Sequence, residues 1–290
     1  MRLKIVTGMA VVYVVWGSTY VAMRVGVRDL PPLLLSGVRF LLAGLVLTAW
    51  CTTRPGFRRP TGRQWRDAAV LGLLMPAAGT GGATWAEQRL PAGIAALLLA
   101  TIPVWTILLG RVADGERIGV PTAAGLVLGL AGVAVLVDPG GGHTDLLSAA
   151  VALGGAVAWG AGSVYAGHAD HPAQPLLGSG LELVCAGGIM LTLGTAGGEP
   201  ARVHAVPAEG VLALVYLVLF GSLLAYSCYD WLLAHAPARL VATYPFVNPV
   251  VAVLLGWALL GEAVGLRTAV ATAVIVAAVA LIVTTTRSGR

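Results

Sequence analysis

The chain has 290 residues, of which 58% are hydrophobic and only 11% are charged, and its mean hydropathy is +0.87. A soluble domain of this length cannot bury so much apolar surface in one core, so the composition excludes a water-soluble globular protein and indicates an integral membrane protein. The net charge of +5 does not indicate nucleic acid binding, because the basic residues gather between apolar segments.

Ten apolar segments follow one another along the chain. A membrane-spanning helix needs about 20 mostly apolar residues. The segments predict helices over residues 5–25, 33–51, 67–86, 92–111, 121–137, 146–166, 175–196, 209–231, 238–260 and 266–285. Strands of an outer-membrane barrel are excluded because runs such as 269–283 are apolar on every side. The first segment follows two basic residues, but no small-x-small cleavage site comes after it, so we predict a mature helix and not a secretory signal.

The sequence contains one unit twice. Residues 91–137 align without a gap with residues 237–283, an offset of 146 (237 − 91). Earlier in each unit, Trp16-Gly17 matches Trp159-Gly160 at an offset of 143 (159 − 16). Each unit holds an odd number of predicted helices, so the second must enter the membrane from the opposite side. The sequence therefore predicts an all-α membrane protein of two inverted five-helix repeats, at 5–137 and 146–284, a plan typical of secondary transporters.

Basic residues orient the predicted helices. If the N-terminus is cytoplasmic, the inner segments hold twelve Lys and Arg residues and the outer segments hold five. This distribution follows the positive-inside rule and predicts an inner-membrane protein with both termini in the cytoplasm.

Several motifs resemble those of a known family. They lie at residues 16–20, 37–40, 93–96 and 244–252, together with the pairs Gly115-Glu116 and Gly261-Glu262. In combination they resemble the EamA family of the drug/metabolite transporter superfamily, in particular YedA-type bacterial inner-membrane exporters, over about residues 5–284. The resemblance implies a ten-helix transporter with a central cavity lined by the first, third, fourth, sixth, eighth and ninth helices. Relatives handle amino acids, other metabolites and drugs, so it implies no particular substrate.

Arg39 and Glu182 are the charged residues well inside predicted helices, and they occupy the same place in the two repeats (182 − 39 = 143). Intramembrane charges are expensive and suggest function. Inversion places Arg39 in the outer half of the membrane and Glu182 in the inner half, which argues against a direct ion pair. Glu182 is a candidate for binding a proton or a cationic substrate, and Arg39 for attracting a carboxylate or stabilising an outer gate. The alternative is that both fix helix packing.

Pro103 and Pro249 lie at equivalent positions inside the fourth and ninth predicted helices. Proline lacks the N–H that a helix requires, and paired interruptions of this kind point to a transporter binding site, although a kink that only shapes packing is the alternative. Asn248, beside Pro249, strengthens the functional interpretation, since a buried carboxamide must find hydrogen-bond partners.

Aromatic and hydroxyl residues gather in the helices that the resemblance places at the cavity, a lining suited to an amphipathic organic solute. The candidates are Trp16, Ser18, Thr19, Tyr20, Thr80, Thr84, Trp85, Thr101, Trp105, Trp159, Ser163, Tyr226, Tyr229 and Tyr244. Packing or a place in the interfacial aromatic belt is the alternative for each of them.

Other sequence features indicate structural roles. Glu116 and Glu262 precede the fifth and tenth predicted helices, where a carboxylate can cap free N–H groups. Cys51, Cys185 and Cys228 show no metal-ligand spacing and are expected to be buried thiols. The sequence suggests no metal site and no cofactor.

The sequence favours transport over other functions. A membrane serine or aspartyl protease, a His-Glu-x-x-His enzyme and an ATP-driven pump all lack their signatures here, so we expect no enzyme activity and a gradient as the driving force, with protons as a candidate coupling ion. We predict export of small metabolites, amino acids or amphipathic drugs by alternating access. A lipid or lipid-linked-sugar flippase on the same plan is the main alternative, and a scaffold is another. Partners would be the bilayer and a small solute, with a homodimer as an open possibility.

Overall fold

Every element of this computed structural model is helical over the residues that it describes, which are 1–115, 119–137, 145–236, 238–241 and 243–285. The first half contains α1 (Arg2–Gly26), α2 (Pro32–Thr52), α3 (Gly62–Gly72), the π-helical stretch η1 (Leu73–Thr80), α4 (Gly81–Ala86), α5 (Ala92–Leu99), α6 (Ile102–Asp114) and α7 (Val120–Val137). The second half contains α8 (Leu146–Ala166), α9 (Pro175–Ala196), the 3₁₀ turn η2 (Glu199–Arg202), α10 (Ala208–Tyr216), the π-helical stretch η3 (Leu217–Leu224), α11 (Ala225–His235), α12 (Ala238–Val241), α13 (Tyr244–Leu260) and α14 (Leu266–Thr285).

Length and composition allow seven helical segments of the described chain to cross a membrane. They are Arg2–Gly26, Pro32–Thr52, Ala92–Ala113, Val120–Val137, Leu146–Ala166, Pro175–Ala196 and Ala208–His235, and two shorter apolar helices cover Val247–Leu260 and Leu266–Leu281. Large apolar side chains such as Leu45, Leu254 and Trp257 are exposed, while Arg39 and Ser222 are buried. Apolar residues outside and polar residues inside are expected where lipid is the solvent.

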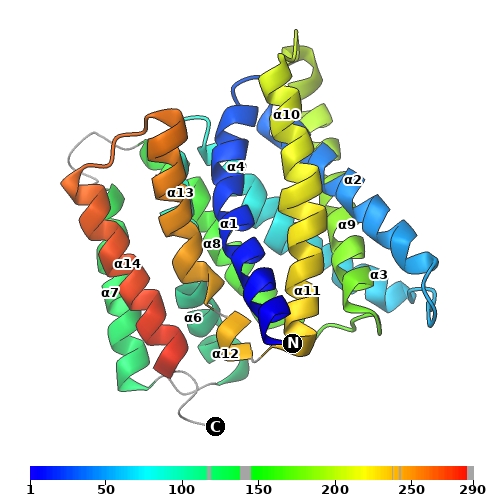
Figure 1. The fold of residues 1–290 in the computed structure, drawn as a ribbon, viewed down its shortest axis with the longest axis horizontal. Helices are drawn as coiled ribbons and strands as arrows, with labels where there is room; N and C mark the ends of the chain where they lie inside the picture. Colours follow the sequence, from blue (N-terminus) through cyan, green and yellow to red (C-terminus); the bar gives the residue numbers. More distant parts are fainter. Residues whose placement is uncertain (116–118, 138–144, 237, 242, 286–290) are drawn as a thin grey trace.

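The helices form one elongated bundle in which two pairs of equivalent helices from the two halves pack together (Figure 1). α7 lies beside α14 at one end of the bundle, and α2 lies against α9 toward the other. The N-terminus and the C-terminal end of α14 lie at the same edge of the bundle, the lower edge in Figure 1.

Glycine permits the close approach of α2 and α9. A Cβ atom on Gly44 of α2 would lie 2.5 Å from the backbone nitrogen of Val184, and one on Gly187 of α9 would collide with the backbone nitrogen of Leu41. These two glycines are equivalent in the two halves (187 − 44 = 143). Small residues that let backbones touch are a common means of helix association in membranes, where apolar burial offers no advantage over lipid.

Two predicted helices are interrupted. The segment predicted at 92–111 divides between α5 and α6, so Pro103 lies in the first turn of α6 and not in the middle of a helix. The first turn tolerates proline because its N–H groups have no intrahelical partner. The segment predicted at 238–260 divides between α12 and α13, and there Pro249 does lie inside the continuous helix α13.

Two further segments widen into π-helix, which the sequence analysis did not predict. η1 and η3 occupy nearly equivalent places in the two halves, since their first residues differ by 144 (217 − 73). Pro76 lies within η1 and has no N–H to bond to the preceding turn, which accounts for the widening there. Short π-helical stretches are frequent at functional sites.

Carboxylates cap helices across long sequence distances. Glu262 accepts hydrogen bonds from the backbone N–H groups of Ala92 (2.8 Å) and Gly93 (3.4 Å), so it caps α5 and not the tenth predicted helix. Glu199 likewise caps α2 through the N–H of Leu34 (2.9 Å). Glu116 lies outside the described residues. Among the cysteines, Cys51 is buried and the other two are half-buried, all as free thiols.

Candidate functional site

Two hollows meet in the centre of the bundle. The first, here called the Arg39 cavity, has a volume of about 90 Å³ and is lined by Trp16, Thr19, Tyr20, Met23, Arg39, Thr80, Leu99, Ile102, Trp159, Tyr226, Tyr244 and Asn248. The second, called the Glu182 chamber, has a volume of about 320 Å³ and is lined by Trp16, Leu71, Met75, Pro76, Trp159, Ser163, Ala166, His171, Pro175, Gly178, Ser179, Glu182, Tyr226, Tyr229, Asp230, Leu233 and Tyr244. Four aromatic residues, Trp16, Trp159, Tyr226 and Tyr244, line both.

Trp16 packs on three tyrosine rings at the junction of the hollows. The ring of Trp16 lies 5.6 Å from that of Tyr226, 5.1 Å from Tyr229 and 5.0 Å from Tyr244, measured between centroids. The indole N–H of Trp16 donates to the carbonyl oxygen of Gly221 at 3.2 Å. Edge-on and tilted contacts at these distances are favourable. These rings form the boundary between the Arg39 cavity and the Glu182 chamber.

Each repeated tryptophan touches the π-helical stretch of the opposite half. Trp16 bonds to Gly221 in η3. Its equivalent Trp159 packs on Gly79 in η1, where a Cβ atom would lie 2.6 Å from the indole ring. The two halves therefore contact each other twice in the same way, each time through the tryptophan of one half and the π-helical stretch of the other.

Arg39 is held by the π-helical stretch η3. Its Nε donates to the hydroxyl of Ser222 at 3.0 Å and its Nη2 to the carbonyl oxygen of Gly221 at 3.4 Å, while Nη1 lies 3.5 Å from the sulfur of Met23. The side chain is buried. A guanidinium in a membrane protein needs such partners because water is absent. Arg39 lines a cavity, and each of its three guanidinium nitrogens also contacts a protein group.

Glu182 lies in the other hollow, with a second carboxylate nearby. Asp230 of α11 also lines the Glu182 chamber and accepts a hydrogen bond from the Ser179 hydroxyl at 2.9 Å. In the described part of the chain no ion pair joins Arg39 and Glu182, and they line different hollows.

The two hollows differ in their surroundings. The Glu182 chamber reaches Ala166, His171 and Leu233, of which His171 and Leu233 are exposed, in the region of the α8–α9 loop and the end of α11. At the Arg39 cavity, by contrast, the lining residue Met23 is buried with Ser36 and Thr84, and Thr84 Oγ1 lies 3.0 Å from the Met23 sulfur and 3.1 Å from Ser36 Oγ. Of these residues, the exposed ones thus line the Glu182 chamber.

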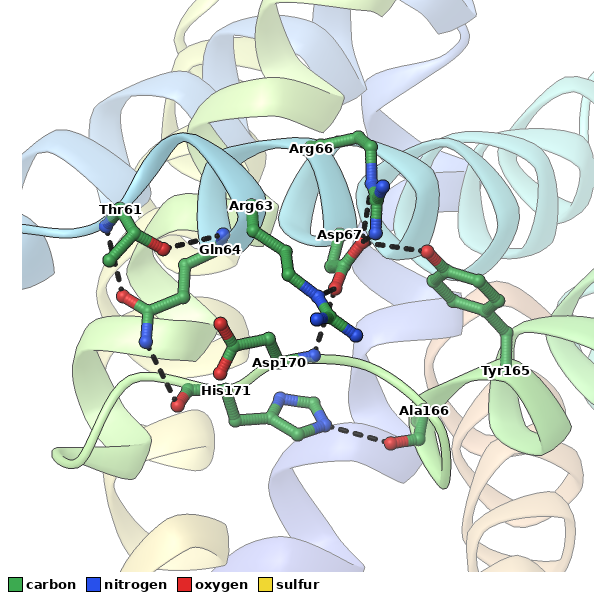
Figure 2. A network of polar contacts seen from close by, with 9 residues as sticks. All are labelled: Thr61, Arg63, Gln64, Arg66, Asp67, Tyr165, Ala166, Asp170 and His171. Carbon is green, nitrogen blue, oxygen red and sulfur yellow. Dashed lines mark hydrogen bonds and ion pairs between the residues drawn. The ribbon is translucent and has the colours of Figure 1, made fainter.

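A polar network borders the mouth of the Glu182 chamber (Figure 2). Asp67 of α3 accepts hydrogen bonds from the Tyr165 hydroxyl (2.8 Å), the backbone N–H of Asp170 (2.9 Å) and the guanidinium of Arg66 (2.7 Å). Gln64 Nε2 donates to the carbonyl oxygen of His171 at 3.3 Å. The network ties α3 of the first half to the end of α8 and the following loop in the second half.

The helix interruptions contribute polar groups near the hollows. Trp105 Nε1 donates to Thr101 Oγ1 (3.1 Å), and that hydroxyl donates to the carbonyl oxygen of Leu98 (2.6 Å), so both side chains stabilise the break between α5 and α6. With its amide oriented to donate, Asn248 Nδ2 lies 3.2 Å from the carbonyl oxygens of Tyr13 and Tyr244. Asn248 also lines the Arg39 cavity.

The structure places the predicted site residues in two groups. Those that line a hollow are Trp16, Thr19, Tyr20, Arg39, Thr80, Trp159, Ser163, Glu182, Tyr226, Tyr229, Tyr244 and Asn248. Those that do not are Ser18, Thr84, Trp85, Thr101, Pro103, Trp105 and Pro249. Ser18 instead bonds to the Tyr216 hydroxyl at 2.6 Å in a groove on the outside of the bundle.

Sequence reasoning did not select Met23, Met75, Pro76, Ser179 and Asp230, which also line the hollows. Two of these residues could have been recognised from the sequence. Pro76 is a proline inside an apolar segment, and Asp230 is a carboxylate within a segment able to cross a membrane. The others acquire their place only from the packing of distant helices.

Comparisons with known proteins agree with these features. The model of the EamA-like transporter family matches the chain twice, at residues 3–138 and 146–284. The chain is 39% identical over 276 residues to the "Uncharacterized inner membrane transporter YedA" of Escherichia coli K12, which covers 93% of this chain and 87% of that protein. It is 31% identical over 264 residues to the "Probable terminal-alkyne amino-acid exporter" of Streptantibioticus cattleyicolor (89% and 86%), and 27% identical over 269 residues to the "Probable amino-acid metabolite efflux pump" of Escherichia coli K12 (87% and 85%).

One solved crystal structure aligns with 100% of both chains at a TM-score of 0.66 and 22% identity, a likeness that shows the shared fold alone. The two matches of the family model together span nearly all of the sequence, and the identity to YedA extends through both halves. The chain therefore belongs to the EamA-like transporter family and is a transmembrane transporter.

Proposed function

We propose that the chain crosses the inner membrane ten times, as two inverted five-helix repeats at 5–137 and 146–284 with both termini in the cytoplasm. The double match of the family model supports the repeats. Pairing of the equivalent helices α2 with α9 and α7 with α14 supports an inverted arrangement, since an axis between equivalent elements brings them together. The N-terminus and the C-terminal end of α14 at one edge of the bundle fit an even number of crossings.

On this plan the protein is a secondary transporter that exports small amphipathic organic solutes by alternating access. The observation that carries the proposal is the Glu182 chamber at the junction of the two halves, which reaches the exposed residues His171 and Leu233, while the side chains of Met23, Ser36 and Thr84 beside the Arg39 cavity are buried. This arrangement corresponds to an inward-facing state. Rocking of the halves about the interlocked Trp16 and Trp159 would expose the same site outward.

The lining and the relatives together support organic export. Aromatic rings with a few polar groups suit an amphipathic solute. The names of two relatives specify export of an amino acid or an amino-acid metabolite. Protons are the coupling ion we propose, with Glu182 as the group that carries them, since it is a carboxylate within a helix and faces the chamber.

The proposal is tested by counterflow into proteoliposomes that contain the purified chain, with a panel of labelled amines, amino acids and other small metabolites, in the presence and absence of a pH gradient. We expect saturable counterflow of at least one solute, and loss of its pH dependence in Glu182→Gln. Indifference to every solute together with active scrambling of labelled lipid would overturn the proposal in favour of a flippase. The described residues give no separate support for a flippase.

A further inference from the structure

Two carboxylic acids line the Glu182 chamber. Among the described side chains that line it, the carboxylates are those of Glu182 and Asp230, His171 is also present, and there is no lysine or arginine. The guanidinium of Arg39 lines the other cavity and contacts Ser222, Gly221 and Met23. A substrate carboxylate entering the chamber would therefore meet two acids and, among the described side chains, neither lysine nor arginine.

Glu182 is the less satisfied of the two acids. Asp230 accepts a hydrogen bond from Ser179 at 2.9 Å, whereas no described residue donates a hydrogen bond to the Glu182 carboxylate, and no ion pair includes it. A carboxylate on a membrane helix without a donor or counter-charge is costly. It gains most from a ligand that brings a positive charge and N–H donors.

The rest of the chamber fits the body of such a ligand. Tyr226 and Tyr229 lie on α11, the same helix as Asp230, and Trp16 lies against both of their rings. Aromatic faces attract cations, more strongly where water is excluded. Leu71, Met75 and Leu233 supply apolar surface, and methionine adapts to ligands of different shape.

We propose that Glu182 and Asp230 form a binding site for a small organic cation, an amine with an aromatic or aliphatic body, whose ammonium group lies between the two carboxylates. The inference deepens the proposed function by naming its substrate class. Binding itself can be measured without transport, so the two proposals can fail separately.

The experiment compares three ligands with the same phenol ring and different charge: tyramine, tyrosine and 3-(4-hydroxyphenyl)propionate. Binding to the full chain in detergent is measured by calorimetry for the wild type, Glu182→Gln, Asp230→Asn and the matched control Glu209→Gln, whose carboxylate is exposed at the start of α10. We expect tyramine to bind at least tenfold more tightly than the propionate. Each chamber variant should weaken tyramine binding about tenfold, since hydrogen bonds to charged groups are worth that much, and Glu209→Gln should not.

Equal or tighter binding of tyrosine or the propionate would overturn the inference, as would unchanged tyramine binding in both chamber variants. If Glu182→Gln does not fold, Glu182→Asp and Asp230→Asn keep the test valid. Tyramine binding without counterflow of any solute would refute the proposed transport but not this site. Counterflow of zwitterions or anions with no preference for the cation would refute this site but not transport.

Discussion

The Arg39 guanidinium in α2 donates to the carbonyl oxygen of Gly221 in η3 at 3.4 Å, across a separation of 182 residues. Trp16 of α1 donates to the same oxygen. A widened π-helical turn thus receives donors from two helices of the other half, which fixes η3 at the boundary between the two hollows. An intramembrane charge that looks functional in the sequence has a structural partner.

Arg39→Lys tests this attachment. Lysine keeps the positive charge but has one compact ammonium group in place of the fork that reaches Ser222 and Gly221. We expect a lower melting temperature in detergent, because a buried hydroxyl or carbonyl left unpaired costs about 1 to 3 kcal/mol. The control is Arg202→Lys at an exposed position. Equal melting temperatures for both variants and the wild type would show that the charge alone matters.

Gly187→Ala tests the contact between α2 and α9. The added methyl group would collide with the backbone nitrogen of Leu41, which cannot rotate away as a side chain can. We expect destabilisation of about 1 to 3 kcal/mol, the usual cost of overpacking. Gly188→Ala on the same helix is the matched control, because a Cβ atom there meets no atom within 4 Å. Similar melting temperatures for the two variants would contradict the close packing.

Much of the helical layout could be predicted from the sequence because it depends on local apolar runs. Residues 146–166, 175–196 and 266–285 are helices with the predicted bounds. The π-helical stretch η3 could not be predicted, since the partners of Gly221 and Ser222 come from the tertiary fold. The division between α5 and α6 was not predicted either, although the bonds that stabilise it are local, from Thr101 to Leu98 and from Trp105 to Thr101. η1 was predictable in principle from Pro76.

The candidate site was predictable only as a set of residue types. Aromatic residues of the expected cavity helices do line the hollows, but Ser18 faces the outside and Thr84 is buried behind the Arg39 cavity. The side on which a helical residue lies depends on the rotation of its helix, which a segment apolar all round does not reveal. The cap formed by Glu262 on α5 likewise joins residues 170 positions apart.

Glu87→Gln tests a buried carboxylate at the end of α4. Both Glu87 carboxylate oxygens are buried without a hydrogen-bond partner in the described structure, and only its backbone carbonyl accepts from Arg24. A neutral amide removes the cost of burying a charge, so we expect a higher melting temperature. Slower counterflow in the same variant would show that the carboxylate is kept for function, while a lower melting temperature would contradict the interpretation.

Asp145→Asn tests a charge outside the membrane. Hydrogen bonds from the Ser148 hydroxyl and backbone N–H, with Arg89 at 3.6 Å, hold the pKa of Asp145 below its usual value of 3.8. A lowered pKa in the folded state adds stability above pH 3.8 that is lost as the pH falls through the folded value. The melting temperature of the wild type should exceed that of Asp145→Asn at pH 6 and converge with it near pH 3. A difference that persists unchanged at pH 3 would refute the charge effect.

Asp67→Asn tests the network at the chamber mouth (Figure 2). The Asp67 carboxylate accepts from Tyr165, Asp170 and Arg66 at once, and an amide has only one acceptor oxygen for these donors. We expect the Asp170 amide to exchange hydrogen roughly tenfold faster, because a lost hydrogen bond to a charged group is worth about that factor. Arg63→Ala is the control, since the Arg63 side chain is 65% exposed and 4.0 Å from Asp67, a geometry that contributes little. His171, in the same α8–α9 loop as Asp170, lines the chamber. Loosening of this loop should therefore also change the rate of counterflow. Unchanged exchange in Asp67→Asn would show that the loop is held by other contacts.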